Sequence, residues 1–277
     1  MRLRSRIPAA LAGLLACAPA AQAPDEGSSS SSSNGNGSGS DDASGEADDA
    51  TSAANSEAGD TADTDTGDTS DDGPIPAACV TGEPAPQSIP ELVARIEALP
   101  HPVTIPCVLA SLPRPLSVVA TDSEFSIQPA VGEDNPRLFI LGDGLILSVV
   151  PAGDGAPLLE FSEWVDSTHT IKGELAFPIT ETIDPGDPYD LEYQDGLTRC
   201  GVCHANEYEV AERPGAHASL ALQPVATSLV DVDGLDALLA DCDWQAEAAR
   251  CELLSGLLDH GEVVEGAFPE DLPTIFD

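Results

Sequence analysis

Hydrophobic residues near the start of the folded part of the chain recur at the spacing of one helix face. This spacing predicts an amphipathic helix from Ile89 to Leu99. Ser88 and Glu91 have the separation of a capping box, and Pro100 ends the segment. The residues that would face the core are Ile89, Leu92, Val93, Ile96 and Leu99.

Beyond Pro100 the pattern changes to short apolar runs separated by turn residues. Runs of this length predict β-strands. The candidates are Leu116 to Thr121, Phe125 to Pro129, Leu138 to Leu141, Leu145 to Val150, Leu158 to Trp164 and Thr170 to Phe177. Gly142-Asp143-Gly144 reads as a hairpin turn between two of them. The spacing favours a small antiparallel sandwich or barrel.

Helical periodicity returns near the C-terminus, at Leu235 to Ala240 and at Ala246 to His260, where Gly261 is a stop signal. We therefore expect an α+β fold with one N-terminal helix, a β-rich sandwich or barrel-like first half and a helical C-terminal part. We expect a single folded domain over 75–277, with the helix and β module in 88–190 and the helical part in 191–277.

The N-terminus has the features of an export signal. Arg2, Arg4 and Arg6 precede an apolar stretch, and residues 1–23 fit a signal peptide. Leu14-Leu15-Ala16-Cys17 resembles the lipobox of bacterial lipoproteins, although Leu15 departs from the usual small or β-branched residue. The resemblance implies cleavage before Cys17 and a diacylated Cys17 that anchors the protein at the cell envelope or cell surface. Cleavage after Ala23 would instead release a secreted protein.

Residues 24–74 are almost wholly Ser, Gly, Ala, Asp, Thr, Asn and Glu, a composition that predicts a disordered tether. From residue 74 onward, 35 acidic residues stand against seven basic ones, which gives a net charge of −28. Such a charge disfavours binding to nucleic acid or to anionic membranes, so we expect membrane contact only through the lipid. It would suit a basic partner protein, or serve solubility alone.

Without Cys17, six of the seven cysteines remain, an even number that suits an oxidising compartment. The simplest pairing outside the motif described next joins Cys79 to Cys107 and Cys242 to Cys251, although the sequence permits others. Residues nine apart in one continuous helix lie too far apart for a disulfide, so the chain after Cys242 must turn before its helix begins.

Cys200-Gly201-Val202-Cys203-His204 resembles the haem-attachment motif of c-type cytochromes. The resemblance implies that Cys200 and Cys203 form thioethers with haem c and that His204 is the proximal iron ligand. Met1, the only methionine, lies in the signal peptide, so a distal methionine is excluded. The other histidines are His101, His169, His217 and His260, of which His217 is favoured as the distal ligand.

The sequence thus predicts an exported, lipid-tethered monohaem protein that transfers single electrons to or from a redox partner protein, and not a catalyst. The alternative is a binding or structural lipoprotein in which Cys200 and Cys203 form a disulfide and no cofactor is bound. A thioredoxin-like pair would need a buried strand before Cys200, which the polar residues 191–199 disfavour. A zinc site made by the two cysteines and a histidine is disfavoured, because the sequence has no second paired motif to complete it. The acidic run at 63–68 lacks the Gly and Glu positions of a calcium loop. The acidic loops at 184–190 and 231–234 are simpler as turns and caps than as cation sites.

Overall fold

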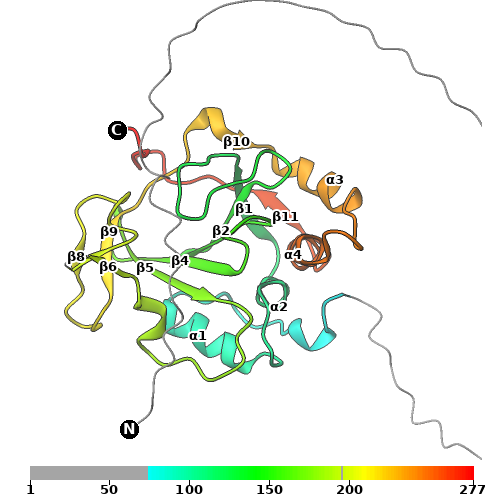
Figure 1. Ribbon diagram of the computed structural model, residues 1–277, viewed down its shortest axis with the longest axis horizontal. Helices are drawn as coiled ribbons and strands as arrows, with labels where there is room; N and C mark the ends of the chain where they lie inside the picture. The colour runs from blue at the N-terminus through cyan, green and yellow to red at the C-terminus, as the bar shows by residue number, and fades with distance from the viewer. Residues whose placement is uncertain (1–73, 195) are drawn as a thin grey trace, which may run out of the picture. The chain divides into compact units, whose positions relative to one another are not determined.

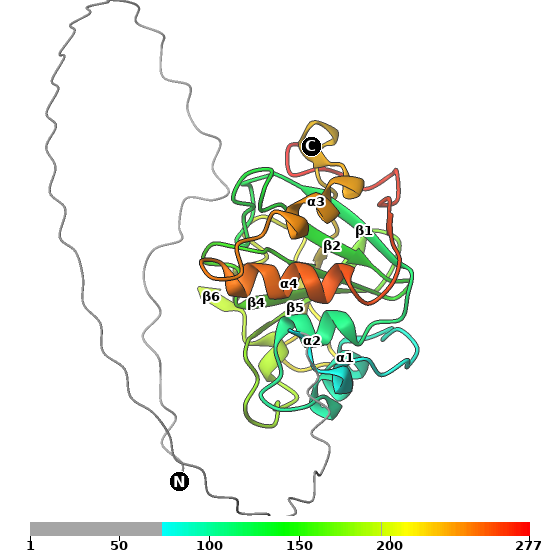
Figure 2. The same cartoon turned by 90° about the vertical axis from the view of Figure 1, so that its right-hand side faces the viewer.

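The protein is described by a computed structural model over residues 74–194 and 196–277. The fold is α+β and is dominated by one nine-stranded sheet (Figure 1). Its strand order is β10-β1-β2-β3-β4-β5-β9-β8, and β11 lies beside β1 in parallel orientation. The helices gather on one side of the sheet, which Figure 2 presents to the viewer.

The elements have the following bounds. The strands of the large sheet are β1 (Leu116–Thr121), β2 (Arg137–Leu141), β3 (Leu145–Val149), β4 (Leu158–Trp164), β5 (His169–Ala176), β8 (Tyr208–Glu209), β9 (His217–Leu220), β10 (Leu229–Val230) and β11 (Val263–Glu265). A separate hairpin joins β6 (Glu192–Gln194) and β7 (Leu197–Thr198). The α-helices are α1 (Ile89–Ala98), α2 (Ile105–Ala110), α3 (Leu235–Ala240) and α4 (Ala248–Leu258). Four short 3₁₀ turns cover Ala77–Cys79, Asp187–Tyr189, Ala226–Ser228 and Val232–Gly234.

Strands β1 to β5 form an antiparallel meander, as the apolar runs predict. Five of the six expected strands agree with the structure to within one residue, and the glycine-rich turn joins β2 to β3. The expected strand from Phe125 to Pro129 is not formed. In its place the chain is held by the buried side chain of Gln128, whose Nε2 donates to the carbonyl oxygens of Gly155 (3.1 Å) and Leu158 (2.8 Å).

Helix α1 begins where the capping pattern predicts. Ser88 Oγ accepts a hydrogen bond from the backbone N–H of Glu91, and the Glu91 carboxylate accepts one from the backbone N–H of Gln87 at 2.7 Å. The backbone N–H of Ile89, which has no acceptor within the helix, donates to the carboxylate of Glu163 on β4 at 2.8 Å. One carboxylate of the sheet therefore fixes the start of this helix, as the orphan N–H groups of a helix N-terminus require.

Helix α2 has no amphipathic signal in the sequence, because all six of its residues are buried. Thr104 caps it by accepting from the N–H of Cys107. Helix α3 coincides with the expected segment, and α4 is shorter than the expected 246–260. The second half of the chain also contributes β8 to β11, so it is mixed in structure.

The core lies between the sheet and the helices. Buried side chains from α1, α2 and α4 pack against alternate residues of the meander, such as Leu138, Leu147 and Leu159. In the described residues, helices and not a second sheet cover this apolar face, because α1 and α2 precede the meander and α4 returns across it (Figure 2). Strand spacing alone could not distinguish this cover from the second layer of a sandwich.

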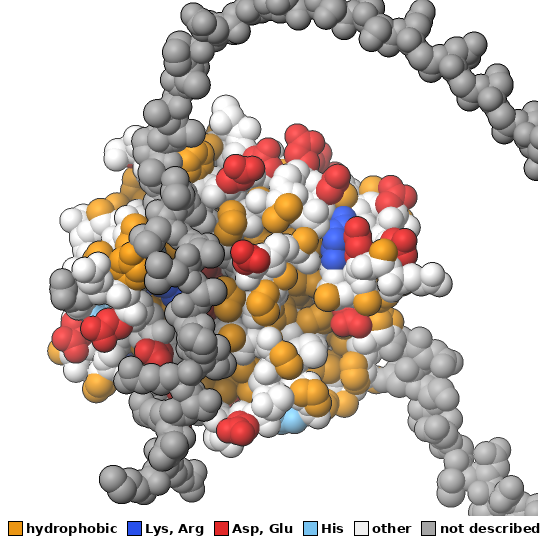
Figure 3. Space-filling model, in the orientation of Figure 1, with side chains coloured by type: hydrophobic (Ala, Val, Ile, Leu, Met, Phe, Trp, Pro, Cys, Tyr) orange, Lys and Arg blue, Asp and Glu red, His pale blue; other side chains and the backbone are white. Residues whose placement is uncertain are grey.

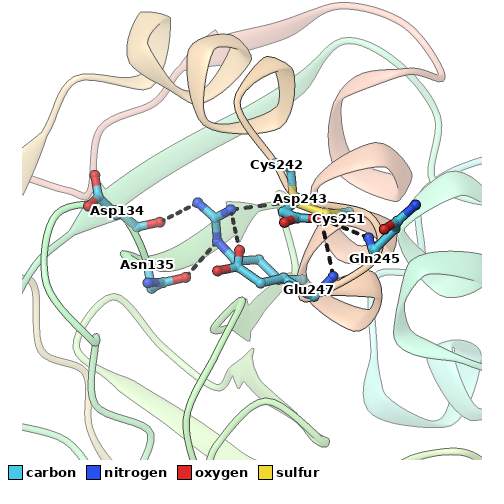
Figure 4. The surroundings of a disulfide bond; sticks show 9 residues. Asp134, Asn135, Cys242, Asp243, Gln245, Glu247 and Cys251 are labelled. Atoms are coloured by element: carbon cyan, nitrogen blue, oxygen red, sulfur yellow. Dashed lines mark hydrogen bonds and ion pairs between the residues drawn. A yellow bond between two sulfur atoms is a disulfide. The ribbon is translucent and has the colours of Figure 1, made fainter. Parts of the chain in front are cut away.

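Two disulfides brace the helical side, and both pairings agree with the simplest prediction. Cys79 joins Cys107 at the start of α2, and Cys242 joins Cys251 of α4 with a Cα–Cα distance of 5.7 Å. The chain turns between Cys242 and Ala248, where α4 begins, as the geometry requires (Figure 4). Arg250 anchors this turn through Asn135 and Glu247 (2.8 and 3.1 Å).

The face of the molecule seen in Figure 3 carries scattered acidic side chains and little basic surface. Across residues 74–194 and 196–277, we find no helix with the length and apolarity needed to cross a bilayer.

The two disulfides should differ in their contribution to stability. Cys79 and Cys107 are separated by 28 residues and Cys242 and Cys251 by nine. Because the loop entropy removed from the unfolded chain grows with loop length, replacing the first pair by Ser should cost about 3–4 kcal/mol and the second about 2–3 kcal/mol. Urea unfolding of the two double variants measures the difference. A larger loss for the Cys242/Cys251 variant would contradict the loop-length explanation.

Candidate functional site

The motif at Cys200 to His204 forms a tight turn that packs against the second face of the sheet. The N–H groups of Cys203 and His204 both donate to the carbonyl oxygen of Cys200, at 3.1 and 2.9 Å. Thr198 Oγ1 accepts from the N–H of Gly201 at 3.1 Å. These bonds make one helical turn, so the two cysteines and the histidine follow each other around a single bend of the chain.

All three motif residues line one cavity between this turn and the sheet. The cavity has a volume of about 130 Å³ and is open on one side. Its sheet side is made by residues of β2 to β5 that alternate with the core residues, including Ser148, Glu160, Ser162 and Lys172. Segments without regular structure, 221–225 and 275–276, complete the wall.

His204 is partly buried and is oriented by the backbone. Its Nδ1 lies 2.8 Å from the carbonyl oxygen of Leu220, the last residue of β9. Since a carbonyl only accepts, Nδ1 carries the proton in this bond. Burial, together with the positive charge of Lys172, holds the pKa of His204 well below its usual value, so the ring is neutral. A neutral imidazole with Nδ1–H bound to a carbonyl leaves the Nε2 lone pair available to a metal.

Cys200 carries a free thiol, so it is not joined to Cys203 in the structure. Burial raises the pKa of this thiol to about 12, and the nearby charge of Glu160 adds to the shift. The thiol is therefore protonated at neutral pH and is a poor nucleophile in this state. This environment does not suit a thioredoxin-like oxidoreductase.

Charged side chains cover the sheet side of the cavity in pairs. Arg137 binds Glu160 at 2.5 Å, and Arg199 binds Glu174 at 2.6 Å. Burial outweighs the attraction of Arg199 and raises the pKa of Glu174 to about 7. The remaining charge, Lys172, has no such partner: its Nζ donates to Thr170 Oγ1 at 2.6 Å. Burial lowers the pKa of Lys172 to about 8.

The cavity concentrates residue types that are scarce in this chain. Three of the seven basic side chains after residue 74 line it, namely Arg137, Lys172 and Arg199. So do six of the eight Phe and Trp residues: Phe125, Phe139, Phe161, Trp164, Phe268 and Phe276. Apolar aromatic walls with a few convergent polar groups are typical of a ligand-binding cavity. Sequence reasoning missed this gathering, because its members come from segments far apart in the chain.

The other predicted site residues lie elsewhere. His217 is in β9, partly exposed, with Nδ1 3.2 Å from the carbonyl oxygen of Gly215, and it does not line the cavity. The cysteines of the Cys79–Cys107 and Cys242–Cys251 disulfides lie outside the cavity lining. Cys17, the predicted lipidation site, lies outside the described residues, as does the acidic loop at 63–68.

Within the described part of the chain, no group of three or more His, Cys, Asp or Glu residues is arranged to hold a metal ion. The zinc hypothesis and the cation hypotheses for the loops at 184–190 and 231–234 therefore gain no support. At the motif, the Cys200 thiol and the neutral His204 imidazole have the chemistry that haem c requires, whereas Cys203 is disulfide-bonded and would have to be reduced before it could form a thioether.

Comparisons with known proteins identify no relative: no protein-family model, no curated protein and no solved structure matches this chain. The site is therefore interpreted from its own residues.

The raised pKa of Glu174 predicts a pH-dependent contribution to stability. Between pH 4.5 and about 7 the folded protein retains a proton that the unfolded chain has released, so this contribution to the free energy of unfolding falls as pH rises. In Glu174→Gln, unfolding free energy relative to wild type should rise across this window, by up to about 1.4 kcal/mol per pH unit, and level off above it.

Urea unfolding from pH 4.5 to 8 tests this expectation. Taking the difference between variant and wild type removes the contribution of His204, which has the opposite sign. Glu209→Gln, at an exposed position of β8, controls for the loss of one negative charge. A difference between Glu174→Gln and wild type that does not change with pH would contradict the prediction.

Proposed function

We propose that this protein is an exported monohaem c-type electron carrier, tethered to the cell envelope by a lipid on Cys17. One observation carries the proposal: Cys200, Cys203 and His204 line a single cavity, in which His204 is neutral and held by Leu220. The β-rich first half of the folded domain forms the sheet side of the cavity, and the motif belongs to the second half, which includes helices. Its redox partner would be a protein, and a basic one is favoured by the charge.

The residues have separate tasks in this proposal. Haem, when bound, supplies a one-electron iron couple. Cys200 and Cys203 would hold it covalently, and His204 would bind iron through Nε2 while Leu220 fixes the ring orientation. The aromatic wall of Phe and Trp residues would exclude water from the macrocycle. Arg137 and Arg199, which line the same cavity and are bound to Glu160 and Glu174, would supply positive charge to the anionic propionate groups.

The size of the cavity sets a condition on this function. Its 130 Å³ is close to the roughly 150 Å³ of an engineered cavity that accepts benzene, and it is below the roughly 300 Å³ at which ordinary ligand pockets begin. A porphyrin therefore requires the covering segments 221–225 and 275–276 to move outward. They contain no regular secondary structure, so their displacement would break no strand or helix.

The same volume favours a second candidate, a binding module without a cofactor that takes a small ligand in this cavity. In that candidate, as the sequence suggested it, Cys200 and Cys203 form a disulfide, whereas Cys200 has a free thiol in the structure. The two candidates differ in mass and in colour.

The test is an intact mass and a visible spectrum of the full chain, produced in a host that exports it and attaches c-type haem. The electron carrier should gain the mass of one haem and show a Soret band, and Cys200→Ser/Cys203→Ser should lose both. Cys242→Ser/Cys251→Ser, which removes a remote disulfide, should retain them. A colourless wild-type protein with no added mass would overturn the proposal and leave the binding module.

A further inference from the structure

The chain contains one lysine, and it lies in the cavity at the motif turn. Lys172 of β5 is only 7% exposed, and its Nζ is 2.6 Å from Thr170 Oγ1 and 3.5 Å from Ser162 Oγ. Among the described residues, no acidic group lies within ion-pair distance of this amine. Hydroxyl groups are thus its immediate neighbours, and its positive charge has no direct counter-charge.

The charged side chains of the cavity lining do not balance. Two of its three cations, Arg137 and Arg199, are paired with glutamates of the same lining, and Lys172 is not. One of these glutamates, Glu174, has its pKa raised to about 7, mainly by burial, which weakens the negative side further. Burying an ammonium group without a counter-charge is costly. The cavity therefore favours a ligand that brings a negative charge.

Two buried polar atoms of the lining lack a hydrogen-bond partner in the part of the chain that the structure describes. They are Nε of Arg199, a donor, and Oε1 of Glu160, an acceptor. Both residues lie close enough to Cys200 to influence the pKa of its thiol, as does Lys172. Because buried polar groups in proteins are nearly always paired, their gathering at one thiol indicates a place for the polar end of a ligand.

The rest of the lining suits an aromatic ring. Its wall includes two edge-to-face pairs, Phe125 with Phe276 at 5.1 Å and Phe139 with Phe268 at 5.3 Å between ring centroids. The cavity volume of about 130 Å³ is close to the roughly 150 Å³ of an engineered cavity that accepts benzene. One ring with a small charged substituent is thus the ligand whose size and polarity agree with the cavity.

We propose that the cavity binds a small aromatic carboxylate, in which Lys172 supplies the counter-charge of the carboxylate and the phenylalanine side chains enclose the ring. The inference rests on the second candidate function, the binding module without a cofactor, and gives it a ligand class. It applies to the cavity with segments 221–225 and 275–276 in place, so haem in the same cavity would exclude it. A neutral ring of the same size would leave the charge of Lys172 unpaired, and the site should discriminate against it.

The test is calorimetric titration of the exported full chain with benzoate and with benzyl alcohol, a neutral compound of similar size. Wild type should bind one benzoate per chain and prefer it to benzyl alcohol. Lys172→Met keeps most of the side-chain volume and removes the charge. It should bind benzoate about 10- to 100-fold more weakly, the factor that a hydrogen bond to a charged group provides, and bind benzyl alcohol as wild type does.

Arg250→Met is the matched control, because it removes a cation of α4 that lies outside the cavity lining. It should bind benzoate as wild type does. Failure of wild type to bind benzoate, equal binding of benzoate and benzyl alcohol, or undiminished benzoate binding by Lys172→Met would each overturn the inference.

A second measurement needs no variant, because a single lysine gives a single set of NMR signals. In protein labelled only at lysine, benzoate should raise the pKa of Lys172 from its lowered value of about 8, since the carboxylate stabilises the ammonium form. Benzyl alcohol should leave this pKa unchanged. An unchanged pKa with benzoate would overturn the inference even if Lys172→Met did not fold.

An intact mass and a visible spectrum of the same wild-type sample, made in the host that attaches c-type haem, separate this inference from the electron carrier. A haem-loaded protein would overturn the inference and leave the electron carrier standing. A colourless protein that binds benzoate would do the reverse. A colourless protein that does not bind benzoate would overturn both.

Discussion

The alternation of side chains along β4 and β5 is the constraint on which this structure depends. One set of residues, including Leu159, faces the helices and forms the core. The alternate set, Glu160, Ser162, Lys172 and Glu174, is polar, and the motif turn covers it as well. A sheet that is covered on both faces must neutralise the charges on the polar one, because buried charges without partners are destabilising. Arg137 and Arg199 satisfy this need for the glutamates, and Lys172 is left unpaired.

One charged residue, Glu163, lies on the core face of the sheet, and it too is neutralised by partners. Glu163 follows the alternation onto the helical side, where an unpaired carboxylate would be strongly unfavourable. It is bound by both terminal nitrogens of Arg213, at 2.6 and 2.5 Å, and accepts the first N–H of α1. One buried carboxylate thus ties β4, the start of α1 and the segment before β9 together. Since β9 ends at Leu220, this link also bears on the position of His204.

Local patterns in the sequence were sufficient for part of this structure. The capping residues of α1, the β1–β5 runs and both disulfide pairings depend on neighbours in the chain or on simple parity, and they agree with the structure. The parallel pairing of β11 with β1 and the short strands β8 to β10 depend on contacts between distant segments, which periodicity cannot detect. The cavity was missed for the same reason. Lys172 lies in an apolar run that reads as an ordinary strand, and its isolation becomes evident only when its neighbours in space are known.

In the folded part of the chain, the basic side chains mostly bind groups of the protein itself, while acidic side chains dominate the charge of the surface. All seven basic side chains have internal tasks: Arg95 and Arg114 bind backbone carbonyls, Arg213 and Arg250 bind Glu163 and Glu247, and the other three line the cavity. The charged groups on the outer surface are therefore mostly anionic, although Arg199 and Arg213 remain partly exposed. A partner that met this surface would experience attraction if it were basic and repulsion if it were acidic, whichever ligand the cavity holds. Of the cations near the motif, Arg137 and Lys172 are largely enclosed and contribute little to steering a partner, whereas the Arg199 side chain is 40% exposed.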